Sequence, residues 1–487
     1  MNQYQFWFVV GSQHLYGPEV LKEVDAHSRI MAGGFNEDAA VPYEVLYKGV
    51  MTTPDEIRDI CIAANGDPGC AGVITWMHTF SPSKMWIGGL SLLNKPYLHL
   101  NTQFNRNLPF DEIDMNFMNT NQSAHGDREH GFITARLRMK RKIVCGYWED
   151  ARLRSRLADW MRSAVGAVFS RNLRVMRLGD NMRYVAVTEG DKIQAEKDLG
   201  WSVNTWGVGG LSARVQAIAA PQIDRKIEEY RSKYAFGTDN MEAVRYQARI
   251  EVALEQMISE GGFHAFTDTF EDLYGLEQLP GLASQNLMAN GFGFGAEGDW
   301  KTAALGAVMG VMSAGLHKGL SFIEDYTYHF EKGNEAVLGA HMLEISPAIA
   351  KEQPRIEVHP LGIGGRDDPA RLIFEGKEGS AILVTIVDMG GRFRMVAHDV
   401  LAIPPMKAMP KLPVASVMWR PRPDMVTGNE AWIRCGGTHH SVISYDLTAE
   451  HMRDFAEIMG VEFVHINQNT SIENLKMMLA MGDVIWN

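Results

Sequence analysis

The first third of the chain alternates between short apolar runs and longer amphipathic segments. The apolar runs cover residues 6–10, 71–76, 97–100 and 143–147. Runs of this length with few polar positions are typical of strands that are buried on both faces, and strands of this kind that alternate with helices predict a parallel, doubly wound sheet. Ligands of such sheets bind beyond the carboxyl ends of the strands, where the loops containing Gln13 and His78 lie.

A second α/β pattern begins near residue 173, and a β-rich pattern follows residue 316. The second pattern has a strand through Val175 and Met176, long amphipathic helices within residues 211–261 and a strand-like run at 264–270. After residue 316, short β-rich runs separated by Gly and Pro predict a mostly antiparallel sheet or barrel; they cover residues 356–358, 372–374, 381–387, 393–397 and 414–419. The chain is therefore expected to be a multidomain α/β protein, with an N-terminal α/β domain at 1–172, a central α/β domain at 173–316 and a C-terminal β-rich domain at 317–487.

Composition narrows the class of protein. A chain of 487 residues is too long for one hydrophobic core. With 47 Lys and Arg against 59 Asp and Glu, the formal charge of -12 argues against a nucleic-acid-binding protein. Four cysteines without CxxC spacing predict neither a disulfide framework nor a thiolate zinc site. The first residues lack a signal-peptide pattern, and the apolar run at 302–316 is too short to span a membrane, so a cytoplasmic protein is expected.

Four short segments, three of which contain glycine, carry the residues best suited to chemistry. They are residues 295–300, 323–329, 339–342 and 435–440, and they contain Glu297, Glu324, His341 and the pair His439–His440. Side chains so far apart in sequence meet only through a tertiary fold. Such a meeting would form a divalent-metal site with oxygen and nitrogen ligands, and its two carboxylates could also transfer protons. The pattern therefore suggests a metalloenzyme that acts on a small polar substrate.

Each segment also has a simpler interpretation. Glu297 lies just before a predicted helix and could stabilise the helix N-terminus, and an isolated histidine is commonly a hydrogen-bonded core residue. His439 and His440 are adjacent and cannot face the same way on a strand, so at most one of them is predicted to be a ligand. The polar stretch 121–129 could be a surface loop, and residues 361–365 either a turn or a wall for a ligand.

Residues 293–298 formally match the dinucleotide motif GxGxxG. That motif requires a preceding strand and an acidic residue about twenty positions later. Here the preceding pattern, at 280–290, predicts a helix, and the next acidic residue after Asp299 is Glu324. A dinucleotide site is therefore not predicted.

Taken together, the segments resemble the L-arabinose isomerase family. The similarity runs from residues 11–17 through 297–300, 324–330 and 341–344 to 436–440, and it is weakest at 215–237. The resemblance implies a Rossmann-like N-terminal domain, a central α/β domain and a C-terminal antiparallel β-barrel-type domain of the fucose isomerase-like kind. It also implies a homohexamer with active sites at subunit interfaces.

The resemblance further implies the site residues. The divalent-metal ligands would be Glu297, Glu324, His341 and His440, and the cation Mn²⁺, one per active site. The sugar-contacting positions would be Gln13, Leu15, Met182, Phe270 and Ile363, with Gln122 and His125 at positions that reach a neighbouring subunit's site.

The activity implied by the resemblance is isomerisation of L-arabinose to L-ribulose through an ene-diol, with D-galactose to D-tagatose as an expected second reaction. Glu297 and Glu324 would transfer the protons, one between C1 and C2 and the other between O1 and O2, without an assignment of which does which. Two alternatives stay open: an isomerase specific for another aldose, such as L-fucose, and a non-catalytic sugar-binding protein. The second would have no need of two carboxylates beside a metal.

Overall fold

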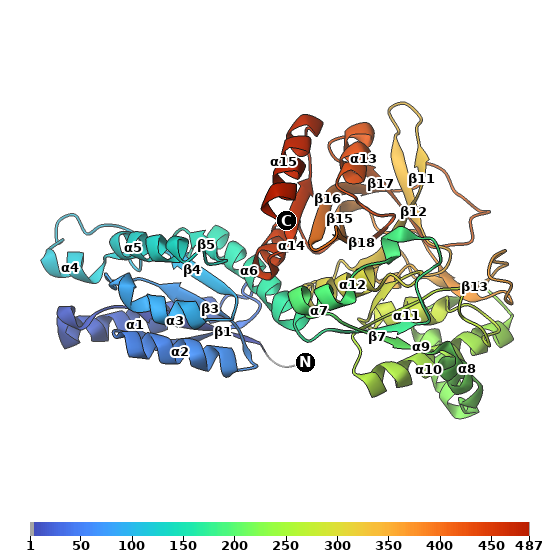
Figure 1. Ribbon diagram of the computed structural model, residues 1–487, viewed down its shortest axis with the longest axis horizontal. Coiled ribbons are helices and arrows are strands. Elements are labelled where there is room, and N and C mark those ends of the chain that lie inside the picture. Colours follow the sequence, from blue (N-terminus) through green and yellow to red (C-terminus); the bar gives the residue numbers. More distant parts are fainter. Residues whose placement is uncertain (1–3, 487) are drawn as a thin grey trace. The chain divides into compact units, whose positions relative to one another are not determined.

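The computed structural model describes residues 4–486 and divides into two compact units (Figure 1). Unit 1 contains the chain up to Val168 together with Arg453–Gly460, and unit 2 contains Phe169–Met452 together with the chain from Val461 onward. The division into three domains at residues 172 and 316 stays a prediction. No helix among residues 4–486 is both long and apolar enough to cross a membrane.

Unit 1 is built on a five-stranded parallel sheet with the order β2-β1-β3-β4-β5. The strands are β1 (Gln5–Gly11), β2 (Glu44–Met51), β3 (Cys70–Trp76), β4 (Tyr97–Asn101) and β5 (Lys142–Cys145). All seven residues of β3 are buried, as expected for a central strand covered on both faces. The predicted parallel, doubly wound sheet is therefore confirmed, although the sequence pattern did not indicate β2.

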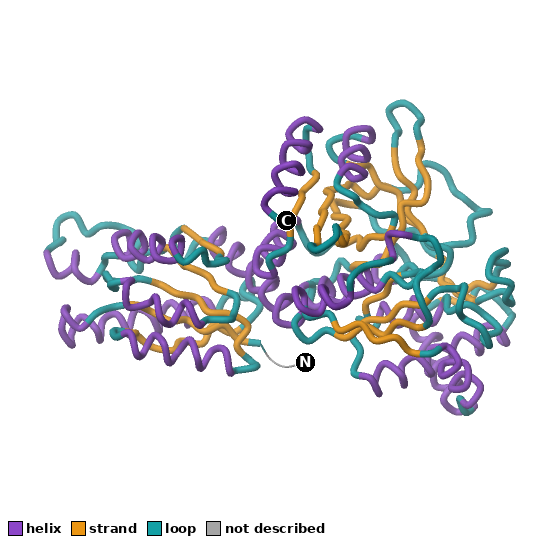
Figure 2. Tube along the Cα trace, viewed as in Figure 1, coloured by secondary structure: helices purple, strands orange, loops and turns teal. Residues whose placement is uncertain are grey.

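The helices of unit 1 lie on both sides of this sheet, as Figure 2 shows. They are α1 (Gly17–Asn36), α2 (Pro54–Gly66), α3 (Ile87–Leu92), α4 (Met115–Thr120), α5 (Ser123–Arg136) and most of α6 (Ala151–Ser170), with single turns at η1 (His14–Tyr16) and η2 (Ser83–Trp86). Helix α2 begins in a capping box, because Thr53 Oγ1 accepts a hydrogen bond from Glu56 N and the Glu56 carboxylate accepts one from Thr53 N. The segment Arg453–Gly460 is held to β5 by an ion pair between Asp454 and Lys142 at 2.7 Å.

Unit 2 contains a four-stranded parallel sheet with the order β10-β9-β6-β7. The strands are β6 (Arg174–Leu178), β7 (Ser202–Trp206), β9 (Ala265–Asp268) and β10 (Gly293–Gly295). The helices of this region are α7 (Lys192–Leu199), α8 (Val208–Ala217), α9 (Ala220–Lys233), α10 (Met241–Gly261), α11 (Leu282–Ala289) and α12 (Trp300–Met312), with a turn at η3 (Ala186–Thr188).

The second part of unit 2 is a closed barrel of six antiparallel strands. Its circular order is β15-β18-β11-β12-β17-β16, and β16 pairs back with β15. The strands are β11 (Leu320–His329), β12 (Ala336–Ala340), β15 (Gly379–Asp388), β16 (Phe393–Ile403), β17 (Ser416–Pro421) and β18 (His440–Ser444), and β19 (Glu462–Ile466) adds to β16 in parallel. Because the pairing of β15 with β16 closes the barrel, each of the six strands has a hydrogen-bonded neighbour on both sides. The predicted antiparallel barrel is confirmed; the finer fold-family assignments stay predictions.

The remaining elements complete unit 2. A small sheet has the order β14-β13-β8, formed by β8 (Ala235–Phe236), β13 (Arg355–Val358) and β14 (Ala370–Ile373). The other helices are α13 (Met425–Arg434), α14 (Ala449–Met459, whose second half belongs to unit 1) and α15 (Ile472–Ile485), with a turn at η4 (Pro347–Ile349).

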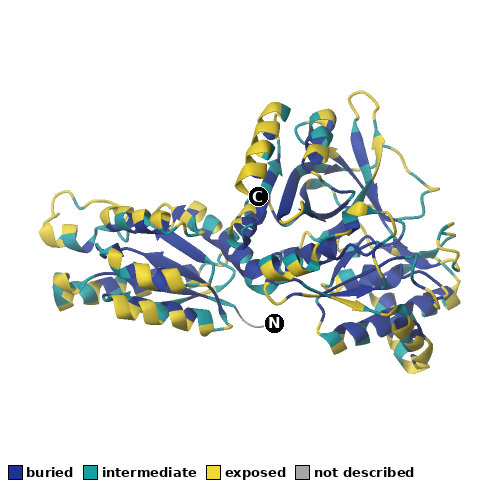
Figure 3. Ribbon diagram, viewed as in Figure 1, coloured by how far each residue is buried: buried dark blue, intermediate teal, exposed yellow. Residues whose placement is uncertain are grey.

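Helix α12 joins the parallel sheet to the barrel. It packs against β10, β9 and β6 on one side and against β11, β15 and β18 on the other. Its first ten residues, up to Met309, are buried, which fits a helix that is apolar all round. One apolar core therefore continues from the sheet into the barrel, and Figure 3 shows these strands in the dark blue of buried residues. The loop before α12 and the nearby barrel strands β11, β12 and β18 provide the site described next.

Candidate active site

The barrel register brings three of the predicted residues together. Glu324, on β11, pairs with His440 of β18 on one side and with Ala340 of β12 on the other. Side chains directly opposite each other in antiparallel strands lie on one face of the sheet, so Glu324 and His440 share a face. His341 follows Ala340 directly.

Glu297 reaches the same place from the loop between β10 and α12. Its φ of 62° lies in the left-handed region, which a non-glycine residue adopts only when its surroundings hold it there. The loop is held by the segment that follows β6: Met182 N donates to Glu297 O at 2.9 Å, and Asn181 Nδ2 donates to Gly298 O at 3.2 Å. A Cβ atom on Gly298 would lie 2.6 Å from Asn181 Cα, so glycine is required for this close approach.

His440 is fully buried between two carboxylates. Its Nδ1 lies 3.2 Å from Asp299 Oδ2, and its Nε2 lies 3.7 Å from Glu297 Oε2 without a hydrogen-bond partner among residues 4–486. Asp299 is itself held in place as the N-cap of α12, where Thr302 N and Thr302 Oγ1 donate to its carboxylate. A proton on Nδ1 therefore bonds to Asp299, and the lone pair of Nε2 is left free.

His341 has the same arrangement. Its Nδ1 lies 2.5 Å from Glu344 Oε2, and its Nε2 lies 3.9 Å from Glu324 Oε2. The rings of His341 and His440 have centroids 6.3 Å apart, and the ring of Phe322 packs edge-on against both at 5.2 Å.

The groups around His341 and His440 are those expected around metal-binding histidines. A histidine that binds a metal through one nitrogen commonly gives its other N–H to a carboxylate, which fixes the tautomer and the ring orientation. Both imidazoles have that partner on Nδ1 and present Nε2 to a glutamate. The Nε2 atom of His440 is fully buried and has no hydrogen-bond partner among residues 4–486, so it is the ligand atom that most needs a metal ion or another partner. Two carboxylates and two imidazoles suit a divalent cation of the Mn²⁺ type.

His439 is also close to this group. Its Nε2 lies 3.8 Å from Glu297 Oε2, and donor atoms of Glu297, His439 and His440 lie within 4.8 Å of one another. The expectation that the two adjacent imidazoles face different ways is wrong, because His439 precedes β18 and is not bound by the alternation of a strand. Both rings approach the same carboxylate.

Charge in the site is predominantly negative. Burial raises the pKa of Glu297, but His439, His440 and His341 outweigh it and hold that pKa below its ordinary value. Burial lowers the pKa of His341, but Glu344 and the two nearby glutamates raise it to about 9. This excess of carboxylates favours a bound cation.

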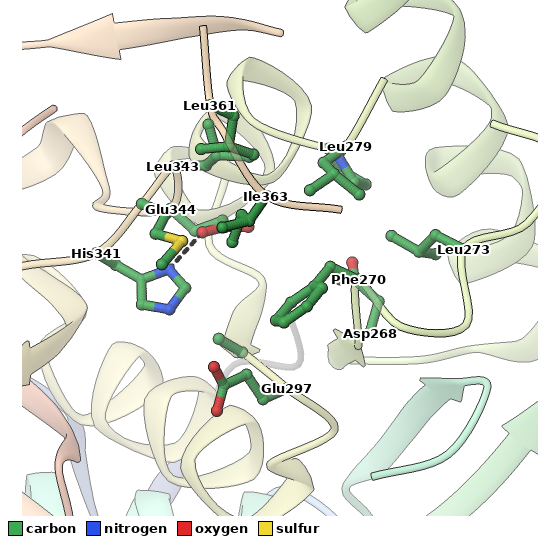
Figure 4. A pocket seen from close by; sticks show the side chains of 13 residues that line it. Asp268, Phe270, Leu273, Leu279, Glu297, His341, Leu343, Glu344, Leu361 and Ile363 are labelled. Atoms are coloured by element: carbon green, nitrogen blue, oxygen red, sulfur yellow. Dashed lines mark hydrogen bonds and ion pairs between the residues drawn. The ribbon is translucent and has the colours of Figure 1, made fainter. Parts of the chain in front are cut away.

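Glu297, His341 and Glu344 also border a pocket that is partly open to solvent (Figure 4). Its polar lining residues are Asp268, Glu297, His341 and Glu344, and the apolar ones include Phe270 and Ile363. Two predicted sugar contacts, Phe270 and Ile363, are therefore placed beside Glu297 and His341. Met182 contacts the Glu297 loop through its backbone and is not among the residues that line the pocket.

The other predicted residues form a second group, within unit 1. Gln13 follows β1, and Tyr16 links it to Gln122, since Tyr16 N donates to Gln13 O and Tyr16 Oη donates to Gln122 Oε1. Leu15 is 83% exposed, and the ring of His125 packs on Phe80 at 4.6 Å. Gln13 lies at the carboxyl end of β1, as the sequence predicted.

Three polar residues of the site were not predicted. Asp299 and Glu344 orient the two histidines, and Asp268 lines the pocket with a buried carboxyl group. Burial, with a smaller contribution from Glu344, raises the pKa of Asp268 to about 8. Asp299 and Glu344 do lie two and three residues from a predicted ligand, which is a usable sequence signal; Asp268 has no such signal.

Comparison with known protein families gives three matches. The chain matches the L-arabinose isomerase N-terminal domain over residues 1–172, the L-arabinose isomerase central domain over 174–315 and the L-arabinose isomerase C-terminal domain over 319–462.

Individual proteins are similar along the whole chain. The L-arabinose isomerase of Anoxybacillus flavithermus is 56% identical, with 100% of this chain and 98% of that protein aligned. Those of Geobacillus kaustophilus and Thermotoga petrophila are 55% and 53% identical, over 100% of this chain and 99% and 98% of the relatives. Among solved structures, a putative branched-chain amino acid ABC transporter from Rhodospirillum rubrum is 14% identical over 68% of this chain and 73% of its own, with a TM-score of 0.18, which is too low to support any conclusion.

Proposed function

Because the chain belongs to the L-arabinose isomerase family, we propose that it is an aldose–ketose isomerase that interconverts L-arabinose and L-ribulose. The reaction is an intramolecular oxidation and reduction, since C2 is oxidised to a ketone while C1 is reduced to an alcohol. D-Galactose, which shares the arrangement of the first carbons, would react in the same way to give D-tagatose.

The proposed cofactor is one Mn²⁺ ion held by Glu297, Glu324, His341 and His440. The carboxylates on both Nδ1 atoms and the free Nε2 of His440 support this ligand set. When bound, the cation would supply positive charge that offsets the negative charge developing on the sugar oxygens.

The two glutamates are the proposed proton carriers. Glu297 Oε2 lies 3.7 Å from His440 Nε2 and Glu324 Oε2 lies 3.9 Å from His341 Nε2, and the substrate's C1 and C2 would lie between these two carboxylates. One carboxylate would take the proton from C2 and return it to C1, and the other would move the proton between O2 and O1. This division of labour requires two carboxylates in different environments. The charged neighbours of Glu297 are the three histidines His439, His440 and His341. Glu324, in contrast, lies near the carboxyl group of Asp325 and shares His341 with Glu344 and Glu297.

The pocket wall would select the sugar. Phe270 and Ile363 provide apolar surface, and Met182 supports the Glu297 loop from behind. Gln13, Leu15, Gln122 and His125 would complete sites at subunit interfaces of a cytoplasmic homohexamer. This last proposal, like the Rossmann-like and fucose isomerase-like fold assignments, is supported by family membership.

The observation that carries the proposal is the matched pair of carboxylate-backed histidines facing two glutamates. The test is ketose formation from a panel of aldopentoses and aldohexoses, with enzyme that has been treated with a chelator and then assayed with and without Mn²⁺. We expect L-ribulose from L-arabinose only after Mn²⁺ is restored. A faster reaction with another aldose would identify a different substrate, and sugar binding without any ketose would identify a binding protein.

Isotope labelling tests the proton-transfer step. In heavy water, the enzyme should incorporate solvent deuterium at C1 of L-ribulose, because a carboxylate that carries the proton exchanges with solvent. Complete transfer of the substrate's C2 hydrogen to C1 would show a hydride shift and would contradict the role given to the glutamates.

A further inference from the structure

Asp268 ends a central strand of the parallel sheet in unit 2. It is the last residue of β9 and pairs with Leu178, the last residue of β6. From β6 the chain first adds β7 on one side and then crosses to β9 and β10 on the other, so the order of the sheet reverses between β6 and β9. Ligands of open parallel sheets bind outside the carboxyl ends of the strands at such a reversal. Asp268 stands at that position.

The carboxyl group of Asp268 is buried and lacks a partner. The residue is 5% exposed, and its Oδ2 has no hydrogen-bond partner among residues 4–486. Its backbone carbonyl accepts a hydrogen bond from Gly298 N at 2.9 Å, which ties the end of β9 to the Glu297 loop. A buried polar atom without a partner destabilises the free protein, so its retention requires an explanation.

The pocket gives that explanation. Asp268 lines the same cavity as Glu297 and His341, and Figure 4 shows it next to Phe270. Of the four polar residues in the lining, Glu297 and His341 belong to the proposed metal site, and Glu344 is bonded to His341. Asp268 is the one whose side chain has no assigned task. Around it the wall is apolar, formed by Phe270, Leu273 and Leu279 among others.

We propose that the Asp268 carboxyl group binds a hydroxyl group of the substrate on the part of the sugar remote from C1 and C2, and thereby contributes to substrate selection. This inference rests on the proposed function, because it takes the reacting carbons to lie beside Glu297 and His341. An acyclic pentose has hydroxyls on C3, C4 and C5 that must leave water when the sugar enters the pocket. In an otherwise apolar wall, a fixed oxygen acceptor forms a hydrogen bond with one of these hydroxyl groups. A sugar that lacks this hydroxyl group binds more weakly, because the acceptor is then left without a partner.

Two variants test the inference. Asp268→Leu keeps a similar volume and removes the hydrogen-bonding atoms, and Asp268→Asn keeps both shape and an acceptor. Because the free enzyme has no partner for Oδ2, we expect the leucine variant to melt at the same temperature as the wild type or higher, and to bind Mn²⁺ equally well. Its kcat/KM for L-arabinose should fall about 10- to 100-fold, mainly through KM. The asparagine variant should lose less.

Deoxy sugars identify the bonded hydroxyl. Kinetics are measured with L-arabinose and with its 3-deoxy, 4-deoxy and 5-deoxy analogues. One analogue should react poorly with the wild type, and Asp268→Leu should not reduce its kcat/KM further, since the bond is already absent. For the other two analogues, the fold-loss in kcat/KM caused by Asp268→Leu and the fold-loss caused by the missing hydroxyl group should multiply. If the leucine variant does not fold, Asp268→Ala replaces it in the same comparison.

Two results would overturn the inference. One is a kcat/KM for L-arabinose within about twofold of wild type in the leucine or alanine variant. The other is a loss that multiplies with all three deoxy analogues, which would show a structural role. Binding of the unreactive polyol L-arabinitol, measured by calorimetry, separates this inference from the proposed function. If the wild type makes no ketose yet binds the polyol more tightly than Asp268→Leu does, the proposed reaction fails and the binding role of Asp268 stands.

Discussion

At the scale of single residues, His341 and His440 have equivalent neighbours. Each has a carboxylate on Nδ1, from Glu344 and Asp299 respectively, and a glutamate near Nε2. The four ligand positions were predicted because they lie in short segments that carry acids and imidazoles, and because these segments resemble one family. Asp268 was not, because a single aspartate at the end of a strand resembles many turn residues, and its importance depends on which loops surround it.

Replacing Glu324 by Gln tests the residue-scale account. The change removes one charge and almost no volume, so the fold should persist while the proton carrier and metal ligand are lost. We expect kcat to fall by about 100- to 10,000-fold, with circular dichroism and melting temperature close to wild type. The matched control is Glu331→Gln, an exposed glutamate in the turn that follows the same strand, which should keep full activity. Near-normal turnover by the Glu324 variant would refute its assignment.

At the scale of elements, the sequence predicted the buried strands well and the polar or glycine-rich ones poorly. β11 was not predicted, because its outer half, residues 324–329, is mostly polar and only partly buried. β10 was not predicted because two of its three residues are glycines, which have low strand propensity. The strand exists because α12 packs closely on it: a Cβ on Gly295 would lie 2.2 Å from Asp299 O. β10 forms the first three residues of the GxGxxG match, and the helix predicted before that match is present as α11.

A pair of glycine substitutions tests this packing. Gly295→Ala would force apart β10 and the start of α12, which positions both Glu297 and Asp299. We expect a loss of several kcal/mol in the free energy of unfolding, about the size of a severe core overpacking, and loss of activity. Gly310 lies in α12, and among residues 4–486 an added Cβ there would have no heavy atom within 4 Å apart from its chain neighbours and the backbone of its own helix. Gly310→Ala should therefore be neutral or stabilising by about 0.5–1 kcal/mol. Urea unfolding of both variants makes the comparison, and equal stability of the two would contradict it.

A charged cluster between α9, α10 and α11 should make stability depend on pH. Burial raises the pKa of Glu229, but hydrogen bonds from Lys226, Lys233 and Asn286 outweigh it and lower the pKa to about 2. The carboxylate therefore stabilises the fold fully above its ordinary pKa of 4.5, and this contribution is lost as the pH falls toward 2.

Glu229→Gln removes this contribution. At pH 7 we expect it to reduce the free energy of unfolding by roughly 1–2 kcal/mol, a value discounted for the solvent that reaches the group. The difference from wild type should narrow as unfolding is measured from pH 4.5 downward. Glu228→Gln, on the exposed side of the same helix, should show almost no difference at any pH. A difference in the free energy of unfolding between Glu229→Gln and wild type that grows as the pH falls would contradict this prediction.

At the scale of the whole molecule, the active-site chemistry depends on joining two architectures. Glu297 comes from the loop after a strand of the parallel sheet, and the other three proposed ligands come from the barrel. Hydrophobic pattern predicted each architecture separately, but it contains no information on the register that pairs Glu324 with His440. That pairing is a long-range property of the closed barrel. The sequence singled out the segments that carry these side chains, and the family resemblance gave the set of four ligands.

The most direct test of the central claim is to locate manganese in crystals of the protein by anomalous diffraction. We expect one peak per active site, in direct coordination by Glu297, Glu324, His341 and His440. A peak held by Glu297, His439 and His440 without Glu324 or His341, or no peak at this place in crystals of enzyme that Mn²⁺ activates, would contradict it.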